Sequence, residues 1–435
     1  MEIIRKIDDL VKIRGKLLDS TVSFCTPQYI LIEKELRDRC IKIKKEFERI
    51  YKKTNLFYSY KTNTIPYMAK LIHSTGIGAE ACSLFELQLA LKLKEKNIIF
   101  NSPSKTDEEI IYAIKNSGKV TIIIDSLSEF AKISKLTKDL KRKISIGARV
   151  DTGIYKTRNF TGFGVKEKDM LFLFKKSNGN PYLNISGLHF HAGSELKEPS
   201  LYAKNLRSIG KIIRKINQEQ RAEIQFVDVG GGIGVSGYAP LSLPEVALKL
   251  VGNKFSQNFG KKEYNINPVA PISDFAKVIT ENFKNHILCI SHVNEPKLYV
   301  EPGRWLVNPA MHLLTKVLYK KPGNVIILDG GRTLAIFLNR EFHVILNLTN
   351  PSVEKQTGRL FGPLGVDDHV GNIYYGNALK EGDVVCISDV GAYSCSTAMQ
   401  YVKPLPKCVS LTKGGKLKEI RREETFEYRF GRDRY

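Results

Sequence analysis

The chain has 435 residues, enough for two or three domains or for one large barrel with an accessory domain. Lys and Arg number 68 against 45 Asp and Glu, a net charge of +23, but they are spread along the whole chain without interleaved aromatic residues, which argues against nucleic-acid binding. No apolar run could span a bilayer, and the seven cysteines are scattered without a CxxC pair, so we expect a cytoplasmic protein with reduced thiols, no membrane contact and no metal site.

From residue 56 to 304 the chain alternates strand-like and helix-like segments. Each strand-like segment is short, rich in Val, Ile, Phe or Tyr, and bounded by polar residues or glycine. The candidate strands are 56–61, 78–82, 97–101, 120–125, 144–150, 183–190, 223–229 and 297–301. Three of the helical segments between them begin with a capping box, in which Ser83, Thr106 or Ser126 is followed three residues later by Glu.

Eight strands alternating with helices predict a (β/α)8 barrel. The competing open, doubly wound sheet carries its glycine fingerprint after the first strand, whereas the triple glycine of this chain follows the seventh. Segment 233–270 is too long for a plain strand-to-helix connection, so we expect an inserted loop at the active-site end.

After residue 305 the pattern becomes strand-like, with segments such as NVIILDGG and GDVVCISDVG and few helical faces. The stretch 20–25 (STVSFC) also resembles a strand and is expected to join them. We therefore predict a barrel domain of residues 28–304 and a β-rich domain of residues 1–27 and 305–435.

Chemistry in such barrels lies where the strands end, so these positions are the candidate site. They carry Lys61, Glu80, Arg149, Asp151, His189, His191, Ser194, Gly230, Gly231, Gly232, Glu301, Gly303 and Arg304. Taken singly, each has a simpler interpretation: a surface lysine, a His-x-His pair on one strand face that would also suit a metal, or a glycine turn. Together they bring an amine, an imidazole, an acid and two phosphate-binding elements to one barrel mouth.

This combination predicts a bound phosphate ester with an aromatic ring. Backbone N–H groups of a glycine-rich turn can approach a phosphate closely, and an arginine can add a charged contact. A desolvated lysine can form a Schiff base with an aldehyde, and a carboxylate can hold a ring nitrogen protonated. These are the requirements of pyridoxal phosphate (PLP).

The motifs FYSYKTN, GAEACS, GLHFHAGS, the triple glycine, EPGR and GAYSCS resemble those of the fold-type III PLP-dependent decarboxylases, the diaminopimelate, ornithine and arginine decarboxylase group. The resemblance extends from about residue 26 to residue 411. It implies a (β/α)8 barrel with a β domain, and a head-to-tail homodimer with active sites at the interface.

The resemblance also implies a role for each matching residue. Lys61 would bind the cofactor, with Glu80 beside it, and His191 would stack on the ring. Glu301 would pair with the pyridine nitrogen. The phosphate would be held by Ser194, Gly230, Gly231, Gly232, Gly303, Arg304 and Tyr393.

Two departures from the family pattern concern the substrate. DGGRTLAIFLNREFHVI keeps a histidine, His343, but has Ala335 and Asn339 where the diaminopimelate decarboxylases have Arg and Tyr. In GPLGVDDHV the family's cysteine for Cα protonation is absent: either Gly365 replaces it, or one residue is missing and Asp368 keeps the final acid of the motif.

We therefore expect an unusual, anionic substrate, with a citrate-conjugated diamino acid such as N-citryl-ornithine, from carboxylate-siderophore biosynthesis, as the first choice. Candidate anion contacts are Arg332, Arg340 and Arg158, with Asp368 as a further substrate contact. The proton donor to Cα is expected among His369, Asp368, Lys61, Cys395 and water.

Four alternatives remain open: a decarboxylase of diaminopimelate, ornithine or lysine, a decarboxylase of a carrier-protein-bound amino acid, a racemase, and an inactive regulator. The racemase would need a second base facing Lys61. The regulator would explain the missing cysteine, but the intact lysine, glycines, EPGR and GAY oppose it.

Overall fold

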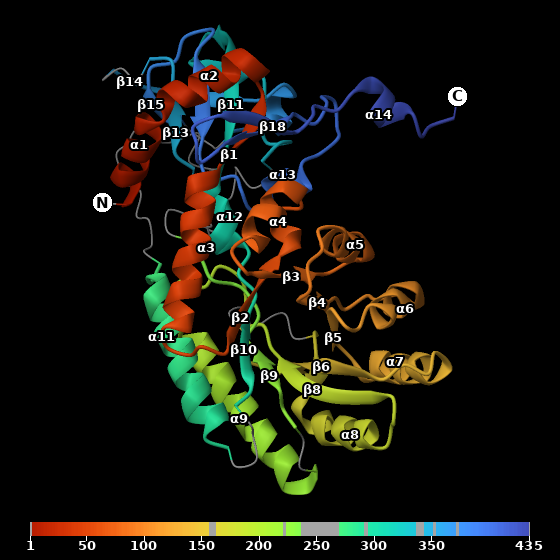
Figure 1. The fold of residues 1–435 in the computed structure, drawn as a ribbon. Helices are drawn as coiled ribbons and strands as arrows, with labels where there is room; N and C mark the ends of the chain where they lie inside the picture. Colours follow the sequence, from red (N-terminus) through yellow and green to blue (C-terminus); the bar gives the residue numbers. More distant parts are fainter. Residues whose placement is uncertain are drawn as a thin grey trace. The chain divides into compact units, whose positions relative to one another are not determined.

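The computed structural model describes residues 2–155, 162–220, 223–235, 269–290, 295–335, 343–350, 354–370 and 374–434 (Figure 1). The chain forms two compact units. One unit includes Met1–Leu36 and Leu306–Tyr435, and the other includes Arg37–Gly234 and Val269–Trp305. The second unit thus ends at Trp305, next to the expected barrel limit of 304. It begins at Arg37, nine residues after the expected limit of 28.

The second unit is a closed barrel of eight parallel strands, as predicted. Its strands are β2 (Thr54–Ser59), β3 (Gly78–Ala81), β4 (Ile98–Asn101), β5 (Val120–Ile124), β6 (Ile144–Asp151), β8 (Leu183–His189), β9 (Phe226–Asp228) and β10 (Lys297–Val300). Neighbours pair in parallel around the ring, which closes because β10 pairs with β2 and β5 pairs with β6. The short β7 (Val165–Lys166) adds to the end of β6. All eight predicted strands are therefore present.

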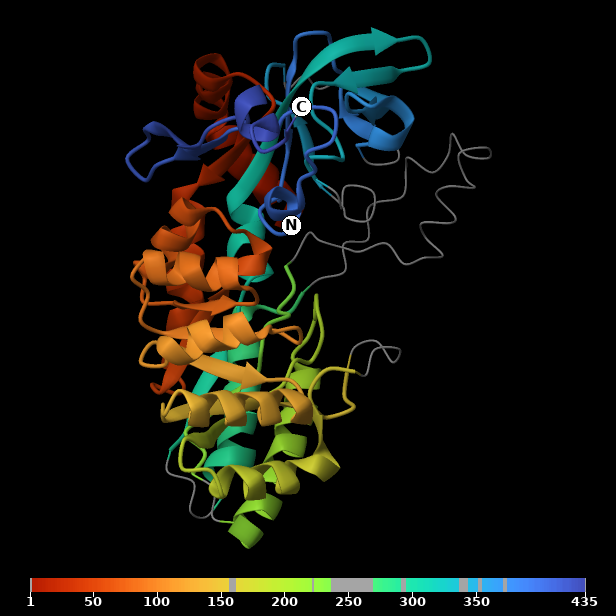
Figure 2. The same cartoon turned by 90° about the vertical axis from the view of Figure 1, so that its right-hand side faces the viewer.

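Helices connect the barrel strands and lie outside them, as the row of α5, α6, α7 and α8 shows (Figures 1 and 2). The helices that follow strands are α4 (Pro66–His73), α5 (Leu84–Lys92), α6 (Asp107–Lys115), α7 (Leu127–Asp139), α8 (Glu167–Asn178), α9 (Ser200–Gln220) and α11 (Ile272–Phe283), which continues into η3 (Lys284–Leu288). Helix α3 (Glu33–Glu48) precedes β2, and α12 (Arg304–Val307) with η4 (Asn308–Ala310) follows β10.

The three predicted capping residues do cap their helices. Ser83, Thr106 and Ser126 each accept a hydrogen bond from the backbone N–H three residues later. Only Thr106 forms the full box with Glu109. The carboxylates of Glu86 and Glu129 accept instead from the N–H one residue before the cap, at 2.7 and 2.8 Å.

The barrel interior is filled by large side chains from several strands. Phe57, Ile99, Ile123 and Phe226 form one buried cluster, and Tyr299 stacks on Phe226 with ring centroids 4.6 Å apart. Glycine at position 187 leaves room for Phe226, since a Cβ there would lie 2.2 Å from that ring. The barrel is thus a packed core, and only its mouth is open to chemistry.

The first unit is built on a mixed β-sheet, which confirms the predicted β-rich domain. Its strands are β1 (Gln28–Ile32), β11 (Met311–Lys321), β12 (Val325–Leu328), β13 (Ile345–Asn347), β14 (Lys355–Phe361), β15 (Tyr374–Asn377), β16 (Val384–Ile387), β17 (Cys408–Leu411) and β18 (Leu417–Arg421). The order is β15-β14-β12-β11-β1-β17-β18, with β16 also on β11 and β13 on β16.

Helices α1 (Glu2–Lys12) and α2 (Arg14–Phe24) belong to this unit, as do the short η5 (Gly365–Asp368), α13 (Ser394–Thr397) and α14 (Phe426–Phe430). Leu10 of α1 and Leu17 of α2 join a core with Ile30 and Leu314 of the sheet.

Two sequence predictions about these elements are wrong. Residues 20–25 are helical up to Phe24, because a helix buries Leu17 and Ser20 on one face, and the strand that joins the sheet is β1. Strand β2 ends at Ser59, and Lys61 lies in the following η1 turn (Tyr60–Thr62). The expected insertion falls largely on 236–268, outside the described residues. No helix among the described residues is long and apolar enough to cross a membrane.

Candidate active site

Lys61 lies directly after β2, at the mouth of the barrel, and its amine faces a buried carboxylate. Nζ is 3.5 Å from Oε2 of Glu80, which also accepts a hydrogen bond from the Ser59 hydroxyl. Ser59 and Glu80 are register partners in β2 and β3, so the strand pairing itself brings these groups together. The Lys61 side chain is 45% exposed and that of Glu80 is 1% exposed. Glu80 therefore positions the Lys61 amine, and the exposure of the Lys61 side chain makes it accessible to a ligand.

A second buried carboxylate, Glu301, follows β10 in the barrel mouth. Burial and the charge of Glu301 raise the pKa of Glu80 to about 7, against the opposing effect of Lys61. Burial would also raise the pKa of Glu301, but the neighbouring His189 and the charge of Lys61 hold it at about 2. Near neutral pH, Glu301 therefore carries the negative charge and Glu80 is the group that shares a proton.

Glu301 is poised to accept a hydrogen bond from a ligand. Its Oε1 is buried and has no hydrogen-bond partner among the described residues. Nε2 of His189 lies 3.6 Å from it, and burial lowers the pKa of that imidazole. A buried charged oxygen without a donor is costly, so this atom is expected to meet an N–H group, such as a protonated ring nitrogen.

Asn101 and Asp228 also belong to this buried network, and neither was predicted. Asn101 Nδ2 lies 3.2 Å from Nε2 of His189, and Asp228 Oδ1 accepts from the Gly230 N–H at 2.8 Å. Burial and Glu301 raise the pKa of Asp228. Asn101 and Asp228 are the last residues of β4 and β9, as the predicted His189 is of β8, so the strand-end rule could have found both.

The donor atoms of His189, Asp228 and Glu301 lie within 4.8 Å of one another, a spacing that would also allow a cation. Of the two histidines in the His-x-His pair, only His189 therefore belongs to this buried set.

The glycine turn after β9 offers two N–H groups. Gly230 and Gly232 have φ values of +67° and +105°. Gly230 N–H is used by Asp228, whereas the N–H groups of Gly231 and Gly232 have no acceptor in the described part of the chain. Their carbonyls accept from the Tyr202 hydroxyl at 2.7 Å and the Leu196 N–H at 2.8 Å. The turn is thus anchored through its carbonyls and presents N–H groups suited to an anion.

The three glycines also allow close packing. A Cβ at Gly231 would lie 2.3 Å from the Glu301 carbonyl oxygen, and one at Gly232 would lie 1.9 Å from the Gly193 carbonyl oxygen. Gly303 is equally constrained, because its Cβ would lie 2.4 Å from Cγ2 of Thr62. The glycine turn and EPGR are therefore held against the loops that carry His191 and Lys61.

Arg304 opens α12 and makes an ion pair that was not predicted, with Nη2 3.2 Å from Oε1 of Glu195. His191 is half-buried. Burial and the charges of Lys61 and Arg149 lower its pKa to about 3, so the ring is neutral and able to stack on another ring. Ser194 is exposed. Arg149 itself is paired with Asp125 at 3.4 Å.

Asp151 ends β6, and its Oδ1 accepts a hydrogen bond from the Tyr155 hydroxyl at 2.8 Å. The other predicted residues that the structure describes lie in the β-rich unit. Asp368 is fully buried, and its carboxylate accepts from the N–H groups of Thr333 (3.2 Å) and Leu364 (3.4 Å). His369 is half-buried and its ring lies 4.5 Å from that of Phe361.

Tyr393 has a φ of +63°, is half-buried, and precedes α13, whereas Arg332 is exposed. Arg340 and Arg158 lie outside the described residues. Cys395 is buried, with its sulfur 4.0 Å from that of Cys408.

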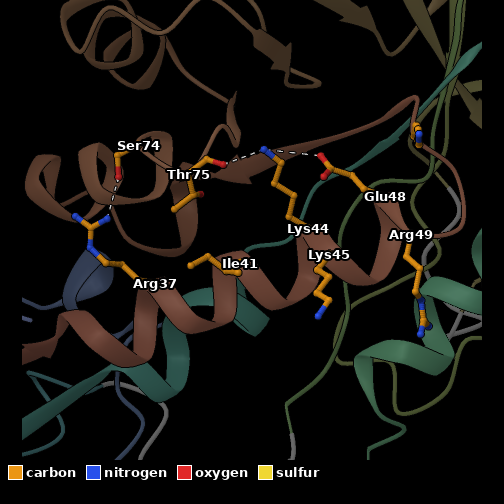
Figure 3. Close-up of a pocket in the computed structure, with 9 residues that line it drawn as sticks. Arg37, Ile41, Lys44, Lys45, Glu48, Arg49, Ser74 and Thr75 are labelled. Atoms are coloured by element: carbon orange, nitrogen blue, oxygen red, sulfur yellow. Dashed lines mark hydrogen bonds and ion pairs between the residues drawn. The ribbon is translucent and has the colours of Figure 1, made fainter.

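A surface groove of about 890 Å³ lies elsewhere on the barrel unit, along α3 (Figure 3). It is lined by Arg37, Ile41, Lys44, Lys45, Glu48, Arg49, Lys52, Ser74 and Thr75. Lys44 lies between the Thr75 carbonyl (3.1 Å) and Glu48 (3.8 Å). None of the predicted site residues lines this groove, so we place the candidate active site at the barrel mouth.

The barrel-mouth groups match what pyridoxal phosphate requires. Lys61 offers an amine for the aldehyde, and the N–H groups of Gly231 and Gly232 suit the phosphate. Oε1 of Glu301 is a charged acceptor for the ring nitrogen.

Comparison with known proteins points to the same cofactor. The model of the pyridoxal binding domain of pyridoxal-dependent decarboxylases matches residues 33–308. The diaminopimelate decarboxylase of Methanocaldococcus jannaschii is 26% identical over 427 residues, covering 93% of this chain and 90% of the relative. That of Campylobacter jejuni is 25% identical over 422 residues, covering 93% and 95%.

Solved structures give the same result. The crystal structure of the M. jannaschii diaminopimelate decarboxylase has a TM-score of 0.82 at 26% identity and covers 96% of this chain and 94% of that one. The Helicobacter pylori diaminopimelate decarboxylase complexed with L-lysine has a TM-score of 0.78 at 25% identity, covering 93% and 96%. The chain therefore belongs to the pyridoxal-dependent decarboxylases and is a carboxy-lyase that uses pyridoxal phosphate.

Proposed function

We propose that the enzyme removes the α-carboxylate of a free diamino acid of the diaminopimelate, lysine or ornithine type. The observation that carries this proposal is the likeness over more than nine-tenths of the chain to diaminopimelate decarboxylases, two of which have crystal structures with L-lysine. A citrate-conjugated substrate, the first choice from the sequence, has no comparable support.

In this proposal each group at the barrel mouth has one task. Lys61 would hold the cofactor, with its amine at the aldehyde. Glu301 keeps the ring nitrogen protonated, and the neutral ring of His191 stacks on the cofactor. The cofactor, when bound, draws electrons from the bond to the leaving carboxylate. Glu80 keeps the Lys61 amine oriented through the 3.5 Å contact.

The phosphate is held by groups of three kinds in this proposal. N–H groups of Gly231 and Gly232 are available to it. The Ser194 hydroxyl and the Arg304 guanidinium add contacts from the neighbouring loops, and Glu195 orients the arginine. From the family resemblance, we assign a further contact with the phosphate to the Tyr393 hydroxyl.

We propose Lys61 or His369 as the proton donor to Cα. Both carboxylate oxygens of Asp368 already accept backbone N–H groups, and the carboxylate is packed between Gly331 and Gly362. The Cys395 thiol is buried beside Cys408. These contacts give Asp368 and Cys395 structural surroundings, whereas Lys61 is exposed at the mouth.

One observation keeps the citrate-conjugated substrate as a second candidate. Ala335 is buried with 1% exposure where the diaminopimelate decarboxylases carry Arg, so this chain lacks that cation for a second carboxylate. The cysteine of the family motif is also absent. Gly365 has a φ of +69°, which a cysteine would adopt only with strain, and this favours the alignment in which one residue is missing.

The test is release of CO2 from four substrates supplied separately to the PLP-loaded enzyme: diaminopimelate, lysine, ornithine and N-citryl-ornithine. We expect release from at least one of the three free amino acids. Release from N-citryl-ornithine alone would replace the proposed substrate class by the second candidate. No release from any of them, with PLP bound, would contradict the proposal. Chiral analysis of recovered substrate checks for racemisation in the same samples.

A further inference from the structure

A pair of cysteines in the β-rich unit lies outside the machinery proposed above. The sulfur atoms of Cys395 and Cys408 are 4.0 Å apart. Cys395 is 6% exposed and Cys408 is fully buried. The side chains of Tyr29 and Arg421 lie beside them, with the guanidinium carbon 5.9 Å from the tyrosine ring centroid.

The sheet topology explains why these four residues meet. Cys408 is the first residue of β17, and its register partners are Tyr29 on β1 and Arg421 on β18. Cross-strand partners have their Cβ atoms close together, so the thiol is flanked on both sides. Cys395 approaches from α13, a helix of one turn that ends at the exposed Thr397. Of the two residues, Cys395 is thus the more accessible to a small oxidant.

The two thiols have different acidities. The hydrogen bond to Cys408 and the charge of Arg421 lower the pKa of Cys395 against the effect of burial. Burial raises the pKa of Cys408. Burial likewise raises the pKa of the Cys40 and Cys386 thiols to about 12. A cation beside one thiol and a second thiol in contact with it are the surroundings of a redox-reactive pair.

We propose that Cys395 and Cys408 are a modification site, at which a hydroperoxide converts the thiol pair into an intrachain disulfide. The Cys395 thiolate attacks the peroxide, which leaves a sulfenic acid and the reduced alcohol or water. The Cys408 thiol then displaces the hydroxyl, releasing water and forming the S–S bond. Two thiols are oxidised and one peroxide is reduced, and Arg421 stabilises the attacking thiolate.

Closing the bond displaces α13. Sulfur atoms 4.0 Å apart must approach to roughly 2.0 Å. Cys408 is fixed in the sheet, so α13 is the element that moves, and Tyr393 immediately precedes it. This consequence rests on the proposed role of Tyr393 in holding the phosphate, and it predicts weaker cofactor binding in the oxidised enzyme.

The first experiment treats the folded holoenzyme with hydrogen peroxide, blocks the remaining thiols, and digests with chymotrypsin and trypsin. Cleavage after Tyr393 and Lys407 separates Cys386, Cys395 and Cys408 into different peptides. We expect a linked peptide joining Cys395 to Cys408 and loss of two thiols per chain. Unmodified Cys395 and Cys408, or a link to any other cysteine, would overturn the proposal. This readout does not depend on the catalytic assignment.

The second experiment follows bound PLP and activity relative to each variant's untreated sample. We expect peroxide to release PLP and lower activity, and dithiothreitol with added PLP to restore both. In Cys408→Ser no disulfide can form, so excess peroxide oxidises the Cys395 sulfenic acid further to a sulfinic acid, which dithiothreitol does not reduce, and the loss should no longer be reversed. The control Cys25→Ser/Cys289→Ser lacks the two exposed thiols and should respond like the parent enzyme.

Equal, reversible sensitivity of Cys408→Ser would overturn the proposal. A disulfide that forms without any effect on PLP would refute the coupling to Tyr393 alone. Arg421→Met should slow the formation of the link, whereas Arg421→Lys, which keeps the charge, should slow it less. A link that forms at an unchanged rate in Arg421→Met would contradict the role of the arginine.

Discussion

At the residue scale, the charges around Lys61 follow from burial and from strand register. Three carboxyl groups, those of Glu80, Asp228 and Glu301, are buried within one barrel mouth. Like charges at close range cannot all ionise, so the pKa values separate. Glu301 keeps its charge because His189 and Lys61 favour the anion. The site thus has one charged acceptor, Glu301, near a carboxyl group that retains its proton, Glu80. This combination suits a ligand whose ring supplies an N–H donor.

Replacing Lys61 tests the covalent role directly. Lys61→Ala should abolish the visible absorbance of cofactor bound through an imine and lower kcat by roughly 10³-fold or more, since the amine is the proposed attachment point. Absorbance spectra and CO2 release measure the two effects. Lys45→Ala, an exposed lysine in the groove on α3, is the matched control and should change neither. A Lys61→Ala enzyme that keeps the imine absorbance would contradict the assignment.

The raised pKa of Glu80 predicts how stability depends on pH. The folded protein holds this proton up to about pH 7, whereas the unfolded chain releases it near the ordinary value of 4.5. The contribution of Glu80 to the free energy of unfolding is therefore largest below about pH 4.5 and decreases as the pH rises to about 7.

In cofactor-free protein, Glu80→Gln should remove this loss of stability with rising pH. Between pH 4.5 and 8, the free energy of unfolding of the variant should therefore rise by up to about 3 kcal/mol relative to that of the parent. Urea unfolding at several pH values measures the difference. A difference independent of pH would contradict the shifted pKa.

At the element scale, the turns that end the barrel strands depend on glycine for two separate reasons. A positive φ strains any other residue, and a Cβ collides with a neighbouring backbone. Gly232 combines both, with a φ of +105° and a Cβ position 1.9 Å from the Gly193 carbonyl oxygen. Gly153 has a φ of +68°, and its Cβ would meet nothing within 4 Å.

The two glycines allow strain and collision to be measured separately. Gly153→Ala should cost about 1 kcal/mol, the usual effect of a positive φ. Gly232→Ala should cost about 3 kcal/mol or more and weaken PLP binding, because the loop of His191 and Ser194 must shift. Urea unfolding and PLP titration are the measurements. Equal losses in both variants would show that packing against Gly193 is unimportant.

At the scale of the whole molecule, we propose the head-to-tail homodimer that the family resemblance implies. In that arrangement each active site takes residues from both subunits. Light scattering of the holoenzyme should give twice the mass of the chain. A monomer that retains full activity would contradict the proposal.

Subunit mixing tests whether a site is shared. If His369 is donated by the partner, mixing inactive Lys61→Ala with inactive His369→Ala should restore about one quarter of the wild-type activity, because half of the dimers are mixed and each has one intact site. Each variant alone gives the baseline. No recovery after subunit exchange would place His369 and Lys61 of one site in the same chain.

Much of this architecture could be predicted from local patterns. The eight barrel strands are runs of apolar residues bounded by turns, and Ser83, Thr106 and Ser126 mark helix starts through hydrogen bonds within one turn. The strand predicted for residues 20–25 is wrong. β-Branched and aromatic residues favour a strand locally, whereas a helix buries Leu17 and Ser20 on one face.

The sequence by itself determined the barrel, and it predicted Lys61 as the cofactor lysine and the strand ends as the candidate site, because period, turns and motifs are short-range properties of the chain. Only the tertiary structure decided which partners those residues meet. The Arg304–Glu195 ion pair, the Asn101–His189 contact and the packing of Cys395 on Cys408 join segments that no periodicity connects. The charge states of Glu80 and Glu301 depend on that burial and proximity, which arise only when the strands close into a ring.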